Sequence, residues 1–308
     1  MGTPDFAVPS LKALVEGGYE VAAVFTQPDR PKGRGKKLAM SPVKEYALAH
    51  GIAVYQPEKI RRDSVTDLKA LAPDLCVTAA FGQILSQEIL DIPPLGTINV
   101  HASLLPKHRG SAPIAWAMLQ GDRQTGVTTM MTSRGIDDGD MLLQARTDID
   151  PAETCGELTV RLSELGASLL LETLKQLENG TLPREKQDES RMTYDPKLEK
   201  SMGAIDWTES ADAIVRRIHA LNPWPGCTTA SPDGIWKLLR AETAQGSGLP
   251  GEVLSADGKA GLLVAAGENA VHILQMQAPG GKPMASRDYL RGHPMTVGAI
   301  LKEEEHHE

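Results

Sequence analysis

Two polar residues at the end of one strand-like segment could carry out acid–base chemistry. Asn99 and His101 are two positions apart at the carboxyl end of residues 96–100, an apolar and β-branched stretch typical of a buried strand. Because side chains alternate along a strand, both should point to the same side. Open α/β sheets bind their ligands at the carboxyl ends of the strands. An amide and an imidazole would therefore share one ligand-binding edge. Residues 103–106 then turn away from the sheet, and their main-chain groups would be free to bind a flat heterocycle.

A carboxylate could join this pair from a neighbouring loop. Asp137 lies in the glycine-containing stretch 135–140, which follows a predicted strand at residues 127–131. It could orient His101, or hold a water against it, and raise the histidine pKa toward neutral pH. Taken alone, a histidine at a strand end is more often an ordinary polar residue, and Asp-Asp-Gly is usually a turn. The prediction depends on these features occurring together.

The elements that must position these residues alternate between strand and helix. Apolar periodicity predicts strands at residues 19–27, 52–55, 75–80, 96–100 and 127–131, and helices at 42–51, 61–71 and 154–179. This alternation predicts an α/β fold, a Rossmann-like doubly wound and mostly parallel sheet with helices on both faces.

The start of this domain is unusual. A doubly wound domain normally opens with a strand that runs into its first loop, and residues 2–5 look like that loop without a strand before it. Either the sheet begins near residue 20, or the sequence starts inside the domain. A central strand cannot simply be dropped, because its neighbours would be left with unpaired edges.

The second half of the chain has a different texture. Residues 182–202 are rich in charge and proline, which is typical of a linker. A helix is predicted at 211–221, and short strands at 227–230, 235–241, 251–255, 261–265 and 270–278 suit a small β-barrel. We therefore expect a catalytic domain at 1–181, a linker at 182–202 and a second domain at 203–308.

Composition and charge limit the possible partners. The net charge of −8 argues against nucleic acid covering the whole surface. One local basic stretch exists, however, and it consists of Arg30, Lys32, Arg34, Lys36, Lys37 and Lys44. Such a run is usually a solvated face, but here glycines break it and it follows a strand, so it could be a flexible cationic loop near the ligand-binding edge. The sequence shows no signal peptide, no membrane span and no metal-ligand cysteine spacing, so we expect a cytoplasmic protein.

Five stretches of the sequence resemble the folate-dependent formyltransferases, and the resemblance covers essentially the whole chain. The stretches are residues 2–6, 80–85, 98–106, 109–114 and 137–141. The Asn-x-His-x-Ser-Leu-Leu-Pro pattern at 99–106 is specific to the superfamily, and the basic stretch and second domain narrow the choice within it. The resemblance implies 10-formyltetrahydrofolate as formyl donor, the α-amine of methionyl initiator tRNA as acceptor, and an OB-like barrel as second domain.

The resemblance also implies roles for individual residues. Asn99 would hydrogen-bond the oxyanion, His101 would stabilise it and move protons between the amine and the folate nitrogen, and Asp137 would orient His101 through water. The folate site would be lined by Ser103, Leu104, Leu105 and Pro106, with Phe81, Gly82, Gln83, Ile84 and Leu85 nearby. Arg34 is the position expected to matter most for tRNA, within the group Arg30, Lys32, Arg34, Lys36 and Lys37. We expect a monomer and no metal.

Other functions remain open at this point. A sugar-nucleotide N-formyltransferase shares the folate motif but has no need of the cationic loop. A purine-pathway formyltransferase usually has one domain. A folate-binding protein, or one that hydrolyses formyltetrahydrofolate, would keep the histidine and the aspartate. A dinucleotide-dependent oxidoreductase is disfavoured because the glycine fingerprint is absent.

Overall fold

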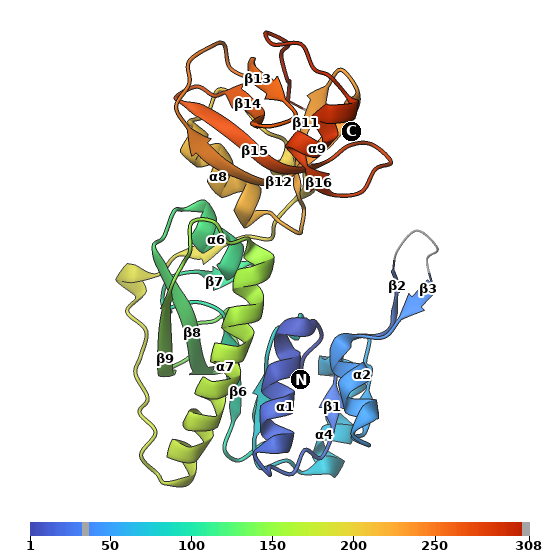
Figure 1. Cartoon of the computed structure of the whole chain (residues 1–308). Coiled ribbons are helices and arrows are strands. Elements are labelled where there is room, and N and C mark those ends of the chain that lie inside the picture. The colour runs from blue at the N-terminus through green and yellow to red at the C-terminus, as the bar shows by residue number, and fades with distance from the viewer. Residues whose placement is uncertain (33–36, 304–308) are drawn as a thin grey trace. The chain divides into compact units, whose positions relative to one another are not determined.

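The structure (Figure 1) is a computed structural model that describes residues 1–32 and 37–303. The chain divides into two compact units. Unit 1 consists of Met1–Pro113, Gln124–Asp148 and Thr159–Asp195, and unit 2 consists of Ile114–Arg123, Ile149–Leu158 and Pro196–Glu308. Residues 182–195 thus belong to unit 1. Among the described residues, no helix is long and apolar enough to span a membrane.

The strands of unit 1 form a mixed sheet system. The central sheet has the order β5-β6-β8-β9, in which β5 (Cys76–Thr78) is parallel to β6 (Thr97–His101). The strand β8 (Gln124–Met131) is antiparallel to both β6 and β9 (Met141–Asp148). A separate parallel pair is formed by β1 (Val24–Phe25) and β4 (Val54–Tyr55).

The expectation of a mostly parallel sheet therefore holds only for part of unit 1. The strand β9 was not predicted, because its outer half is polar and half-exposed and lacks an apolar run. Only nine residues separate it from β8, and a parallel connection needs a dozen or more, so the two strands must be antiparallel. The predicted strand at 19–27 is reduced to the two residues of β1.

Helices cover these strands. Their bounds are α1 (Val8–Glu16), α2 (Pro42–Ala49), α3 (Ile60–Asp63), α4 (Val65–Leu71), α5 (Gln87–Leu90) and α7 (Cys155–Glu178). The three predicted helices are confirmed, with a break at Ser64 between α3 and α4. In α7, a Cβ on Gly166 would lie 2.9 Å from a methyl of Val100 and 3.4 Å from one of Val127, so this helix runs closely along β6 and β8 (Figure 1).

Unit 2 is built on an antiparallel sheet. Its strands have the order β11-β12-β15-β14-β13, with β16 added to β15. The bounds are β11 (Cys227–Ser231), β12 (Gly234–Ala244), β13 (Val253–Asp257), β14 (Gly261–Ala265), β15 (Ala270–Gln277) and β16 (Met284–Ala285), and the helices are α6 (Pro113–Leu119), α8 (Ala211–Ala220) and α9 (Ser286–Gly292). The five predicted strands and the predicted helix are confirmed. Trp207 and Trp236 are buried in the core, whereas Trp224 is 54% exposed.

Residues 299–302 lie between the two edge strands of this sheet. Ala230 in β11 exchanges main-chain hydrogen bonds with Lys302, and Val253 in β13 donates to Ala299. The residues around 300 therefore bond to both β11 and β13, although the named strands themselves do not form a closed ring.

Candidate active site

Asn99 presents a hydrogen-bond donor at the end of β6. Its Oδ1 accepts a hydrogen bond of 2.9 Å from Oγ1 of Thr78, the residue that faces it in register on β5. Since the oxygen of the amide is held in this way, the amide is oriented. Within the described residues the Nδ2 amino group has no partner, so it remains available to donate to a ligand oxygen.

His101 is fixed by a main-chain group. The ring is buried, and its Nε2 lies 2.9 Å from the carbonyl oxygen of His108. A carbonyl only accepts, so Nε2–H is the donor and Nδ1 carries the free lone pair of the neutral ring. Nδ1 lies 3.7 Å from Oδ1 of Asp137. This separation is too long for a direct hydrogen bond and suits an ion pair with the imidazolium or a shared water.

Asp137 is held in an uncommon conformation. Its φ of 51° is in the left-handed region, where non-glycine residues carry strain. The side-chain Oδ2 accepts a 2.9 Å hydrogen bond from the N–H of Gly110. The amide of Gln187 donates to the carbonyl oxygens of Asp137 (2.7 Å) and Gly139 (2.8 Å). The loop is thus fixed on both sides, and the sequence-predicted trio is brought together at one edge.

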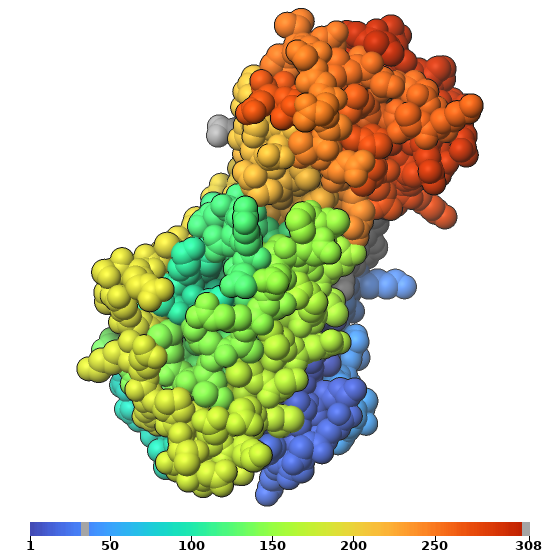
Figure 2. Space-filling model, turned by 60° about the vertical axis from the view of Figure 1, so that its left-hand side comes forward, coloured from blue at the N-terminus to red at the C-terminus, as the bar shows by residue number. Residues whose placement is uncertain are grey.

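The chain that follows α7 supports this loop. Gln187 also accepts a hydrogen bond of 2.9 Å from Nε of Arg109, whose guanidinium forms two hydrogen bonds with Glu189 (3.1 and 2.7 Å). The Arg109 hydrogen bonds are the main reason that the pKa of Glu189 is below its usual value. Figure 2 shows this yellow segment on the outer surface beside the teal residues near 110.

A buried histidine–aspartate pair, His108 and Asp195, lies next to the same segment. The strand β7 (Arg109–Gly110) pairs in parallel with β10 (Tyr194–Asp195). Next to this pair, Nδ1 of His108 lies 2.8 Å from Oδ2 of Asp195, and both side chains are at most 3% exposed. Gln187, Glu189 and Asp195 were not among the residues predicted from the sequence. They lie in a polar stretch without periodicity, and of these supporting residues only Arg109 lies in one of the family-like stretches, residues 109–114.

The turn after β6 is held by its own hydrogen bonds. Oγ1 of Thr128 donates to the carbonyl of Ser103 (2.7 Å) and accepts from the N–H of Leu105 (3.1 Å). Gln144 donates to the carbonyl of Leu105 (2.8 Å). The Ser103 hydroxyl is buried and donates to the carbonyl of Lys107. Ser103 and Leu105 therefore shape the turn, while Leu104 remains half-buried at its surface.

Residues 81–85 divide into buried and open positions. Phe81 and Leu85 pack in a core cluster with Ile89 and Phe25. Gln83 fixes the preceding loop, since it accepts from the N–H of Ile60 and donates to the carbonyl of Pro57. Gly82 and Ile84 are exposed, the latter by 69%. Of the five predicted folate-site residues in this stretch, these two are the most accessible.

The basic stretch forms a hairpin. The strands β2 (Arg30–Lys32) and β3 (Lys37–Ala39) are antiparallel and extend from unit 1 in Figure 1. The predicted residues Arg34 and Lys36 lie outside the described residues. Arg30 donates to Oε1 of Gln27 (3.0 Å), and the Gln27 amide donates to the carbonyls of Phe81 (3.2 Å) and Gly82 (3.1 Å). The base of the hairpin is therefore tied to the predicted folate-binding stretch.

No metal centre is evident in the described part of the chain, where no group of three His, Cys, Asp or Glu residues is placed to hold an ion. The arrangement instead offers an oriented amide donor, an imidazole with a defined free nitrogen and a neighbouring carboxylate. These groups can stabilise an oxyanion and transfer protons.

Comparisons with known proteins agree with this chemistry. The family model "Formyl transferase" matches residues 1–174, and "Formyl transferase, C-terminal domain" matches residues 197–294. The methionyl-tRNA formyltransferase of Alkaliphilus metalliredigens is 50% identical over 309 residues, which cover 99% of this chain and 98% of the relative. That of Trichlorobacter lovleyi is 49% identical over 302 residues, covering 98% and 95%.

Solved structures share the fold at lower identity. The N-formyltransferase from Helicobacter canadensis, in complex with folinic acid and dTDP-3-aminofucose, has a TM-score of 0.65 and 18% identity, covering 88% of this chain and 97% of its own. HypX from Aquifex aeolicus, in complex with tetrahydrofolic acid, has a TM-score of 0.60 and 22% identity, covering 80% and 43%. The family models and the full-length relatives together establish that this chain belongs to the methionyl-tRNA formyltransferase family of formyltransferases.

Proposed function

We propose that this enzyme transfers the formyl group of 10-formyltetrahydrofolate to the α-amine of methionyl initiator tRNA, and so acts in translation initiation. The observation that carries the proposal is the 50% identity to a methionyl-tRNA formyltransferase over 99% of the chain. The geometry of Asn99, His101 and Asp137 supports it, because each group matches one requirement of acyl transfer to an amine.

The chemistry follows from these three side chains. The amine nitrogen attacks the formyl carbon, and the electron pair of the C=O bond moves to the oxygen. The Nδ2 amino group of Asn99 donates to that oxygen. Nδ1 of His101 accepts the proton lost by the amine, and the charge on the ring is stabilised by Asp137 at 3.7 Å. When the oxygen's electron pair re-forms C=O, the bond to the folate nitrogen breaks and His101 returns the proton to that nitrogen.

The proposed folate site combines the two stretches 81–85 and 103–106. The exposed side chain of Ile84 and the half-buried Leu104 offer apolar surface for a flat ring. Gly82 suits the packed base of this stretch, because its φ of 75° favours glycine and a Cβ would lie only 2.7 Å from Nε2 of Gln27. These residues fit a folate, which presents an apolar ring face and hydrogen-bonding edges.

The tRNA site in this proposal is the cationic hairpin with the second domain. The proposed phosphate contacts are made by the cationic side chains of Arg30, Lys32, Arg34, Lys36 and Lys37. The base of this hairpin is tied through Gln27 to the proposed folate-binding stretch, so it lies beside the proposed donor site. The proposed domains are 1–181 and 203–308, joined by 182–202. A Rossmann-like doubly wound core and an OB-like barrel belong to the same proposal, and the main-chain bonds of residues near 300 to both β11 and β13 support the barrel. We also propose that the protein is a monomer and that it is located in the cytoplasm.

A formyl-transfer assay tests the proposal directly. The protein is incubated with 10-formyltetrahydrofolate and one of four acceptors, namely initiator methionyl-tRNA, elongator methionyl-tRNA, an amino-sugar nucleotide or water alone. We expect formyl-methionyl-tRNA from the initiator tRNA and at least tenfold slower transfer elsewhere. Transfer to the sugar alone, or release of formate at the same rate without tRNA, would contradict the assignment. His101→Asn serves as the inactive control, because it keeps a donor to His108 but removes the proton-accepting nitrogen.

A further inference from the structure

The short loop at residues 108–110 contacts two of the proposed catalytic residues through its main chain. The carbonyl oxygen of His108 accepts the hydrogen bond from Nε2 of His101 (2.9 Å), and the N–H of Gly110 donates to Oδ2 of Asp137 (2.9 Å). The two contacts come from positions only two residues apart in the chain. A shift of this loop would therefore move the imidazole and the carboxylate together.

His108 has a conformation that a histidine adopts rarely. Its φ of 61° lies in the left-handed region, where a residue other than glycine carries strain. The side chain is also buried, with 3% exposed. Strained conformations of this kind persist only where the surrounding structure holds them. We therefore expect specific contacts that keep this residue in place.

Thr193, just ahead of Asp195 in the chain, provides two of these contacts. Its Oγ1 accepts a hydrogen bond of 2.8 Å from the N–H of His108. Its carbonyl oxygen accepts one of 2.9 Å from the N–H of Arg109. The main chain of the loop is therefore fixed from the side opposite His101 by the segment that follows α7.

The side chain of Asp195 holds the ring of His108. Its Oδ2 lies 2.8 Å from Nδ1 of His108, and the carboxylate is only 1% exposed. A carboxylate oxygen accepts, so Nδ1–H of His108 is the donor. A hydrogen bond to an ionised partner is about twice as strong as one between neutral groups. Because the ring belongs to the residue whose carbonyl contacts His101, this bond also limits where that carbonyl can lie.

The carbonyl of His108 and the carboxylate of Asp137 favour different tautomers of His101. Both groups accept hydrogen bonds, so the carbonyl favours a proton on Nε2 and the carboxylate favours one on Nδ1. In the structure the carbonyl is at hydrogen-bond distance from Nε2, 2.9 Å, whereas the carboxylate is 3.7 Å from Nδ1. The tautomer with a free Nδ1 therefore depends on the carbonyl staying where it is.

We propose that Asp195, acting through His108, is a positioning residue that sets the tautomer of His101. It keeps the His108 carbonyl where Nε2–H of His101 can donate to it, and so leaves Nδ1 without a hydrogen. Its consequence for rate rests on the proposed function, in which Nδ1 accepts the proton of the attacking amine. With the proton on Nδ1, the ring could not accept from the amine at that nitrogen.

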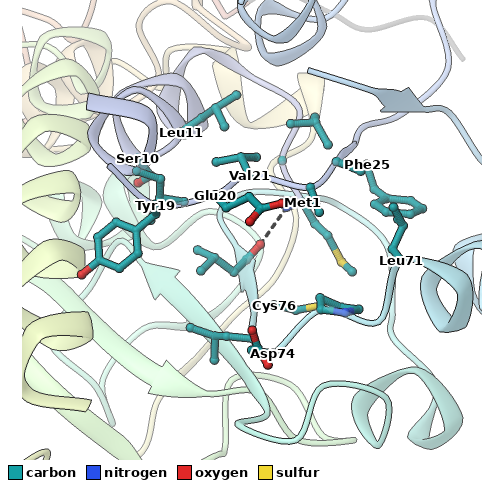
Figure 3. A pocket seen from close by; sticks show the side chains of 18 of the residues that line it. Met1, Ser10, Leu11, Tyr19, Glu20, Val21, Phe25, Leu71, Asp74 and Cys76 are labelled. Atoms are coloured by element: carbon teal, nitrogen blue, oxygen red, sulfur yellow. Dashed lines mark hydrogen bonds between the residues drawn. The ribbon is translucent and has the colours of Figure 1, made fainter. Parts of the chain in front are cut away.

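The large cavity of unit 1 lies away from this loop. It has a volume of about 650 Å³ and is lined by Met1, Tyr19 and Cys76, among other residues (Figure 3). Residues 99–111 and 193–195, all of which the structure describes, are not among those that line it. A loop released from Asp195 therefore has no direct path into that void, and its movement would be felt at His101.

Two variants at position 195 test the inference. Asp195→Ala removes the acceptor for the His108 ring, whereas Asp195→Asn keeps a side-chain oxygen that can accept from Nδ1–H. The tautomer of His101 is followed by NMR on protein with isotope-labelled histidine at about pH 8, above the ordinary histidine pKa. Its signal is identified by its loss in His101→Asn. We expect a mixture of both tautomers in Asp195→Ala and the Nε2–H tautomer in Asp195→Asn. Lys186→Ala, at an exposed position in the same segment, is the control.

Steady-state kinetics provide a second measurement. We expect kcat for formyl transfer to fall by about 10- to 30-fold in Asp195→Ala, while KM for the formyl donor changes by less than about twofold. Asp195→Asn should stay within about threefold of the parent in kcat. If Asp195→Ala does not fold, Thr193→Val takes its place, because it removes the Oγ1 acceptor of the His108 N–H and should shift the tautomer and kcat in the same direction. Thr193→Ser, which keeps the hydroxyl, serves for comparison.

Three outcomes would overturn the inference. Asp195→Ala could keep His101 wholly in the Nε2–H tautomer with an unchanged kcat. It could lower kcat without any change of tautomer, which would assign Asp195 a structural role only. Asp195→Asn could lose as much as Asp195→Ala in both measurements, although it keeps the acceptor. The tautomer measurement needs no substrate, so its failure is distinguishable from a failure of the proposed function.

Discussion

The carbonyl oxygen of His108 determines which nitrogen of His101 is free to react. Because Nε2–H donates to that carbonyl, Nδ1 is left facing Asp137. The position of the carbonyl depends in turn on the paired His108 and Asp195 side chains behind it. At the residue scale, the geometry of the proposed catalytic residues is therefore built largely from main-chain groups and their supports.

The charge of Asp137 can be removed without losing its hydrogen bond. In Asp137→Asn the side-chain carbonyl can still accept from Gly110, but the negative charge near Nδ1 of His101 is gone. We expect kcat to fall by about 100-fold, because the imidazolium is less stabilised, while KM for the formyl donor changes by less than about twofold. Steady-state kinetics provide the measurement. Asp138→Asn is the matched control, and an equal loss in both variants would contradict a specific role for Asp137.

The cationic hairpin should act on tRNA alone. We expect Arg34→Ala to raise KM for initiator tRNA by about 5- to 10-fold and to make the salt dependence of binding less steep by about one phosphate contact. KM for the folate donor should not change. Lys12→Ala, at an exposed position on α1, is the control. Unchanged kinetics with tRNA would remove Arg34 from the proposed interface.

The sequence predicted the proposed catalytic residues better than the residues that support them. Asn99 and His101 were identifiable because strand periodicity places both on one side. Gln187 and Asp195 carried no comparable signal, since they lie in a polar, proline-containing stretch and reach the site only through tertiary contacts. No local pattern specifies such contacts, because they depend on how distant segments pack.

At the scale of elements, the stretch after α7 acts as a brace for the Asp137 loop. Its Gln187 amide bridges two carbonyls of that loop and the side chain of Arg109. Its last residues form the β10 partner of β7. A segment that the sequence favours as a linker thus contributes hydrogen bonds within unit 1.

Gln187→Ala tests whether this bracing positions Asp137. The variant loses both donors to the loop, and we expect kcat to fall by about tenfold with little change in donor KM. Tm should fall by less than about 3 °C, so that the loss of activity exceeds any loss of folded protein. Gln187→Glu cannot donate to the carbonyls and should behave like the alanine variant. Gln176→Ala, on an exposed turn of α7, is the control. Full activity in both Gln187 variants would assign the residue a structural role only.

Strand lengths were the least predictable elements. The apolar residues 19–27 predicted one long strand, yet only Val24 and Phe25 pair. The physical reason is that, in the described part of the chain, residues 20–23 form no main-chain hydrogen bonds with a neighbouring strand. Intrinsic strand preference is weak without cross-strand neighbours, so a sequence pattern cannot fix where pairing ends.

For the whole molecule, pH acts on stability through a buried histidine in unit 2. His219 is 4% exposed; Nδ1–H donates to the carbonyl of Pro151 (3.0 Å), and Nε2 accepts from the N–H of Ala241 (3.3 Å). The second bond requires the neutral ring, because a protonated Nε2 cannot accept a hydrogen bond. Burial is the main cause that lowers the pKa of His219 from its ordinary value of 6.5.

The sign of the pH effect follows from this pKa. Below pH 6.5, His219 is protonated in the unfolded chain but stays neutral in the folded unit until the pH approaches its lowered pKa. The free energy of unfolding therefore falls as the pH decreases toward that pKa. Above pH 6.5 the group has no effect. We expect Tm to decrease between pH 7 and pH 5 in thermal denaturation, and His219→Gln to reduce that decrease. The exposed His50→Gln should retain the original slope; equal slopes in all three proteins would contradict the assignment.

The division into units has a consequence for how this protein can be recombined. Each unit is assembled from three separate stretches of chain, so the polypeptide alternates repeatedly between them. Residues 114–123 supply Leu119 to the core of unit 2, although they precede most of unit 1's sheet and brace in sequence. A fragment ending at residue 195 would expose those inserted stretches without their core. Neither terminal half of the chain therefore corresponds to one complete unit. A chimaera with a relative should exchange all three stretches of a unit together and not a single terminal piece.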